Sequence, residues 1–115
     1  MTKISLAPLL QTYFSDRLIA QKKVSVHTLA SYRDTFKLLL GFSSKRLKKN
    51  PCELCLSELD ADLIGSFLND LELTRRNSIR TRNVRLAAIR SFFQYLSLRE
   101  PAHMGQIQRV LAISQ

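Results

Sequence analysis

The feature that most constrains the fold is the stretch TRNVRLAAIRSFFQYL at residues 81–96, in which apolar residues recur at helical spacing. At about 100° per residue, one face of a helix gathers five apolar side chains: Ile79, Leu86, Ile89, Phe93 and Leu96. Only three glycines and three prolines interrupt the 115 residues, which favours long helices over many short strands. The sequence therefore predicts an all-α domain.

Similar spacing elsewhere predicts a bundle of four helices, or five with a short C-terminal one. The predicted helices cover about residues 6–20, 25–42, 60–71 and 78–98, with a weaker amphipathic piece inside 102–115. Ser25 and Asp60 are the predicted N-caps of the second and third helices. Residues 43–58 are predicted to be a linker, because Gly41, Ser43–Ser44 and Asn50–Pro51 disfavour helix continuation.

Charge is the strongest compositional signal. The net charge is +9, and residues 75–99 hold seven arginines and no acid, whereas six of the nine acids lie between Glu53 and Glu72. Segregation of this kind predicts a positive surface region and a polyanionic partner, most often nucleic acid and less often an anionic membrane surface. The alternative is a domain that is basic without such a partner.

The arginines of the quoted stretch need an explanation, since Arg82 and Arg85 fall within or beside the apolar face of the predicted helix. Burial of an unpaired arginine is very costly, so we expect both at N-terminal turns that protrude from the bundle. The polar residues gathered there could bind phosphate and read base edges: Asn77, Ser78, Arg80, Thr81, Arg82, Asn83 and Arg85. A solvated arginine-rich face is the simpler alternative.

The start of the second predicted helix has a similar composition. Lys22 and Lys23 precede Ser25, and four short, polar or basic residues follow on the helix: His27, Thr28, Ser31 and Arg33. Two such helix N-termini could enter one major groove of DNA.

Three segments carry a resemblance to a known family: VSVHTLASYRDTFKLLL (24–40), LDADLIGSFLNDL (59–71) and RNSIRTRNVRLAAIRSFFQYL (76–96). In this order they resemble the N-terminal core-binding, SAM-like domain of tyrosine recombinases, the phage integrase family. The resemblance implies a helical bundle that holds one face of duplex DNA through its second and fourth helices. Carried over by position, the implied contact residues are Thr28, Ser31, Arg33, Arg80, Thr81, Arg82 and Arg85.

The resemblance also implies what this chain does not do. The family's catalytic residues belong to a separate C-terminal domain, and neither His27 nor His103 begins the family's His-x-x-Arg motif. We therefore expect a DNA-binding domain at residues 1–101, followed at 102–115 by the start of a linker, without enzymatic activity, cofactor or metal. The family implies four protomers on two DNA sites; for the isolated chain we expect a monomer in the cytoplasm.

Other patterns are weaker. Cys52 and Cys55 form a C-x-x-C, but a zinc site needs four ligands and a thioredoxin-like motif needs a βαβ context, so two reduced cysteines are expected. The basic cluster Lys45–Lys49 could follow a phosphate backbone or be a solvated loop. The rival functions are a small helical regulator that binds DNA or RNA, a bundle that binds an acidic protein, and, more weakly, a membrane-surface protein.

Overall fold

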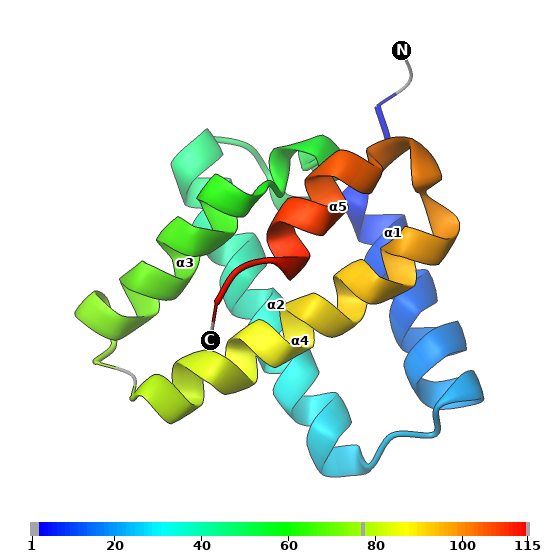
Figure 1. Cartoon of the computed structure of the whole chain (residues 1–115). Coiled ribbons are helices and arrows are strands. Elements are labelled where there is room, and N and C mark those ends of the chain that lie inside the picture. Colours follow the sequence, from blue (N-terminus) through cyan, green and yellow to red (C-terminus); the bar gives the residue numbers. More distant parts are fainter. Residues whose placement is uncertain (1–2, 77, 115) are drawn as a thin grey trace. The chain divides into compact units, whose positions relative to one another are not determined.

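The structure is a computed structural model that describes residues 3–76 and 78–114, and all of its regular elements in these ranges are helical (Figure 1). The prediction of an all-α fold is confirmed. The chain divides into two compact units, residues 1–58 and 59–115, which are described separately below. Among the described residues, no helix is long and apolar enough to cross a lipid bilayer.

The first unit contains two long helical segments and two single 3₁₀ turns. In chain order they are α1 (Leu6–Thr12), the π-helix η1 (Tyr13–Gln21), α2 (Val26–Leu47), η2 (Pro51–Glu53) and η3 (Leu56–Glu58). The helix predicted over residues 6–20 is therefore present, although its second half has the wider π-helical hydrogen bonding, as in the 2.9 Å bond from the Lys22 amide to the Arg17 carbonyl.

The core of this unit consists mainly of leucines, with two aromatic side chains among them. Tyr13 and Phe36 are buried, and the Phe36 ring lies edge-on to Tyr13 and Phe14 at centroid distances of 6.3 and 5.9 Å. At the N-terminal end, the Leu6 amide donates to the Leu54 carbonyl at 3.0 Å, which ties α1 to the segment between the 3₁₀ turns. The apolar spacing of the first two predicted helices is confirmed in part: six of its residues are buried, namely Leu6, Leu10, Tyr13, Leu18, Phe36 and Leu39, whereas Phe14, Leu29, Tyr32 and Leu40 are half-buried.

The predicted end of the second helix is wrong. The chain continues as α2 to Leu47 because Ser43, placed in a linker by its polarity, is fully buried and donates its hydroxyl to the Leu39 carbonyl at 2.8 Å. Gly41 lies on an exposed part of the same helix and does not interrupt it. The helix ends at Lys48, whose left-handed φ of 55° turns the backbone away.

An ion pair organises the turns that follow α2. Lys49 Nζ lies 2.7 Å from Glu58 Oε2, and the Cys55 amide donates to Glu58 Oε1 at 2.9 Å. The hydrogen bond from Lys49, assisted by the Cys55 amide, lowers the pKa of the Glu58 carboxyl against the opposing effect of burial. The hydrogen bond to Glu58 likewise raises the pKa of Lys49.

These shifts predict a loss of stability at acid pH. Because the folded-state pKa of Glu58 is lowered, the carboxylate stabilises the fold above its unfolded pKa, and this contribution disappears as pH falls through the folded pKa. The raised pKa of Lys49 acts in the opposite direction, so its contribution is complete below its unfolded pKa and lost as pH rises through the folded one.

Urea unfolding from about pH 6 to about pH 3 should show a smaller decline in midpoint for Glu58→Gln than for wild type. The charge-matched control Asp34→Asn, on the exposed side of α2, should keep the wild-type decline; an unaltered decline in Glu58→Gln would contradict the assignment.

The second unit contains three helices and one 3₁₀ turn: α3 (Ala61–Thr74), α4 (Ile79–Arg99), η4 (Pro101–His103) and α5 (Met104–Leu111). Asp60 caps α3 as predicted, since its Oδ1 accepts from the Leu63 amide at 2.9 Å. The short C-terminal helix is α5, which packs on both α3 and α4 (Figure 1) and buries Ile107 and Val110 completely. Gln106 Nε2 also donates to the Leu59 carbonyl at 2.9 Å.

The long α4 supplies most of the core of this unit. Leu86, Ile89, Phe93 and Leu96 are fully buried, as the apolar spacing predicts. Ile79 is a correction, because 72% of it is exposed at the first position of α4. The helical repeat places Ile79 on the apolar face, but the first turn of α4 is exposed at residues 79 and 80.

Candidate nucleic-acid interface

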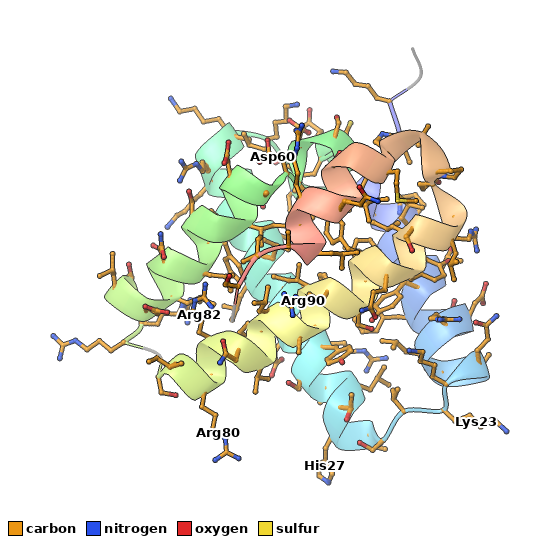
Figure 2. The ribbon with its side chains drawn as sticks, in the orientation of Figure 1. Lys23, His27, Asp60, Arg80, Arg82 and Arg90 are labelled. Carbon is orange, nitrogen blue, oxygen red and sulfur yellow. The ribbon has the colours of Figure 1, made fainter. Side chains whose placement is uncertain are left out.

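The N-terminus of α4 presents polar and positive groups, and the first turn of this helix contains no acidic residue. Ser78 is the N-cap: its Oγ accepts from the Thr81 amide at 3.1 Å and lies 3.1 Å from the Thr81 hydroxyl. Arg80 is exposed and extends from α4 into solvent (Figure 2). Because the remaining first-turn amides carry the positive end of the helix dipole, this end is suited to an anion such as phosphate.

The N-terminus of α2 repeats this arrangement. Ser25 Oγ accepts from the Thr28 amide at 3.1 Å and donates to the Thr28 hydroxyl at 3.0 Å. His27 occupies the position of Arg80 and is exposed. The spacing Ser-x-x-Thr in SVHT and SIRT signals this shared cap in the sequence, although the sequence prediction used only the serine.

The basic residues before and after the start of α2 are also accessible. Lys22, Lys23 and Arg33 are exposed, whereas Ser31 is half-buried on α2. Lys23 adopts a left-handed φ of 49°, and Arg76 before α4 adopts one of 53°. Glycine is the residue that takes this conformation most easily, so the two positions carry a basic side chain at some conformational cost.

Arg82 differs from the other candidates because its partners lie within the protein. Its Nε is 3.0 Å from Glu72 Oε1 on α3, its Nη1 donates to the Ser114 carbonyl at 3.2 Å, and only 18% of its side chain is exposed. The expectation that Arg82 protrudes beyond the bundle is therefore wrong. A half-buried arginine is tolerated here because a carboxylate and a carbonyl accept its hydrogen bonds.

Its neighbours on α4 are partly covered as well. Asn83 and Arg85 are half-buried, and Asn83 Oδ1 lies 3.4 Å from Arg82 Nη1. Arg90, one further turn along, donates through Nη2 to the carbonyls of Leu111 and Ile113 at 3.1 and 2.5 Å. Sequence reasoning missed these partners, because nothing in the local pattern connects α4 with Glu72 or with residues 111–114.

The structure thus brings the candidates together in two groups. Lys22, Lys23, Thr28, Ser31 and Arg33 lie around the start of α2 in the first unit, and Arg80, Thr81, Arg82, Asn83 and Arg85 lie on consecutive turns of α4 in the second. Asn77, which the sequence placed with the second group, lies outside the described residues. Arg80 is the most accessible arginine of its group.

Part of the basic cluster Lys45–Lys49 has contacts within the protein, while Lys45, Arg46 and Lys48 are exposed. Lys45 and Arg46 lie in the last turn of α2, where cations interact favourably with the helix dipole, and the Arg46 guanidinium lies 5.7 Å from the Phe42 ring centroid. Lys49 is engaged by Glu58. The two cysteines next to this cluster are free thiols; Cys52 is exposed and Cys55 is partly so.

Comparison with known proteins places the chain in a family. The model of the phage integrase N-terminal SAM-like domain matches residues 11–100. The chain is 54% identical over 114 residues to "Putative integrase/recombinase y4rC" of Sinorhizobium fredii, and 53% identical over 108 residues to y4rD, which carries the same designation. These matches cover 98% and 94% of the chain but only 34% and 38% of the two relatives, so the chain spans about a third of their length. No solved structure matches the chain significantly.

Proposed function

Because the chain belongs to the family of phage integrase N-terminal SAM-like domains, we propose that it binds duplex DNA as a module of a site-specific tyrosine recombinase. The matching family model describes the N-terminal domain of phage integrases, and no catalytic domain is evident in the 115 residues. In this proposal the module holds DNA at the recombination site for integration or recombination, and a separate domain performs the chemistry.

The observation that carries the proposal is the positive charge of residues 75–99 together with the exposure of Arg80 at the start of α4. Residues 75–99 contain seven arginines and no acid, and Arg80 projects into solvent at the capped N-terminus of α4. Arginine on such a helix end can bind phosphate, and a helix end of this size fits the major groove of DNA. The proposed phosphate contacts are the exposed residues Arg80, Lys23 and Arg33. Thr28 and Thr81 lie in the first turns of α2 and α4, close enough to the helix ends to approach the sugar-phosphate backbone of DNA.

The larger assembly is part of the same proposal. The parent protein would cleave and join strands through a phosphotyrosine intermediate without a cofactor, and four protomers would assemble on two DNA sites in the cytoplasm. The chain alone would be a monomer. Residues 102–115 would lead towards the catalytic domain, and α5 inside this segment packs on α3 and α4.

The proposal predicts salt-dependent binding of duplex DNA. Fluorescence anisotropy of a labelled 20-base-pair duplex should show log affinity falling linearly with log salt, at a slope of about −0.9 for each neutralised phosphate. Binding to an RNA duplex of the same sequence should be weaker, since its deep, narrow major groove does not admit a helix. Stronger binding to RNA would favour an RNA-binding protein, and absence of duplex binding at low salt would favour an acidic protein partner.

A further inference from the structure

Two arginines of α4 hold the last residue of α5 and the segment that follows it. Arg90 Nη2 donates to the carbonyls of Leu111 and Ile113, and Arg82 Nη1 donates to the Ser114 carbonyl at 3.2 Å. In Figure 2 both arginines extend from α4, Arg82 on the side of α3. The course of residues 111–114 is thus set by the helix that carries the proposed DNA contacts.

The two attachment points differ in how easily they can be displaced. Of the two carbonyls bound by Arg90, that of Leu111 belongs to the last residue of α5, where a cation interacts favourably with the helix dipole, and that of Ile113 lies two residues further on. Arg82 is held by Glu72, whose side chain is 38% exposed, and by the exposed residue Ser114. Glu72 and Ser114 are thus accessible to an incoming anion, although only 18% of the Arg82 side chain is exposed, and the Ser114 carbonyl is a weaker acceptor than an anion.

We propose that Arg82 is an exchange point, at which a phosphate of duplex DNA replaces Glu72 and the Ser114 carbonyl. This inference rests on the proposed DNA binding. Arg82 follows Arg80 by two residues, so its side chain leaves α4 on nearly the opposite side, about 200° around the helix axis. In a major groove about 12 Å wide, phosphates flank both sides of an inserted helix end, so a duplex bound at Arg80 presents other phosphates on the side of Arg82. A phosphate carries a formal charge, as Glu72 does, and it can accept two parallel hydrogen bonds from one guanidinium in place of the separate contacts to Glu72 and Ser114.

The consequence is a coupling between DNA and the chain beyond α5. When Arg82 turns to phosphate, Ser114 loses its attachment to α4, while Arg90 keeps Leu111 and Ile113 in place. Binding of DNA at the start of α4 therefore releases Ser114 without unfolding α5. Glu72 acts as an internal competitor that lowers the affinity of the unbound module for DNA.

Nuclear magnetic resonance on the wild-type chain tests the exchange directly. Without DNA, we expect the ¹⁵N order parameter of the Ser114 amide to approach the value of about 0.85 found in rigid backbone, and with saturating 20-base-pair duplex to fall below about 0.6. The Arg82 Nε–H resonance should shift on DNA binding, and the Arg90 Nε–H resonance should not. A mobile Ser114 without DNA, or an ordered Ser114 and unshifted Arg82 with DNA, would overturn the exchange.

Variants supply a second measurement. Arg82→Gln should make the salt slope of duplex binding shallower by about 0.9, Arg82→Lys should restore it, and Arg90→Gln should leave it unchanged. Glu72→Gln should raise affinity about threefold more than the charge-matched control Asp62→Asn on the same helix, and this difference should vanish in the Arg82→Gln background. An unchanged slope in Arg82→Gln would overturn the exchange while leaving the proposed DNA binding intact; wild-type protein that binds no duplex would overturn both.

Discussion

The substitution Phe93→Ala is expected to lower the free energy of unfolding by about 3–5 kcal/mol, the largest stability effect that we predict for a single residue. Phe93 is fully buried on α4, and its ring lies edge-on to Phe92 at a centroid distance of 5.7 Å. Removing the ring exchanges apolar burial for a cavity that the neighbouring helices can only partly fill. Urea unfolding monitored by circular dichroism at 222 nm, at about neutral pH, measures the loss.

Leu98 provides a matched control for this prediction. It lies on the same helix and is likewise apolar, but 72% of it is exposed. Leu98→Ala should therefore change the free energy of unfolding by less than about 0.5 kcal/mol. Similar losses of stability for both variants would mean that position 93 is no more buried than position 98 in solution. A small loss for Phe93→Ala alone would mean that the α4 core is looser than the structure shows.

The sequence predicts the helices better than their ends. Apolar spacing identifies α1, α2, α3 and α4, because each must bury one face, and the Ser25 and Asp60 caps are visible as local signals. The end of α2 is not predictable locally. Ser43 is polar in the sequence, but its hydroxyl bonds to its own helix, so tertiary burial overrides the linker-like composition.

The candidate interface shows the same limit. The sequence identifies both helix N-termini and most of the basic residues near them, since a cap and a charge are local properties; it does not single out Arg75 and Arg76, which precede α4. It does not show that Arg82 is engaged while Arg80 is exposed, because that difference depends on Glu72 and Ser114, 10 residues before and 32 after Arg82. Two arginines in one helical turn can thus have different roles, and only packing distinguishes them.

The separation of these roles makes Arg80 the better test of DNA binding. A charge reversal at Arg82 would bring a glutamate beside Glu72 and remove the bond to Ser114, so weaker binding could result from a disturbed fold. Arg80 is exposed on the first turn of α4, and a reversal there should leave the fold intact. We expect Arg80→Glu to weaken duplex binding about tenfold at 0.1 M salt and to make the salt slope shallower by about 0.9 or more.

Arg109→Glu is the matched control for this variant. Arg109 is an exposed arginine of the same unit, on α5, and its reversal changes the net charge by the same amount. If the DNA contact is local to the start of α4, Arg109→Glu should weaken binding much less than Arg80→Glu, since salt screens charges that lie more than about 10 Å from the phosphates. Equal losses in the two variants would show that net charge alone attracts DNA, and a larger loss for Arg109→Glu would move the interface to α5. Unchanged binding in Arg80→Glu would exclude the N-terminus of α4 as the phosphate contact.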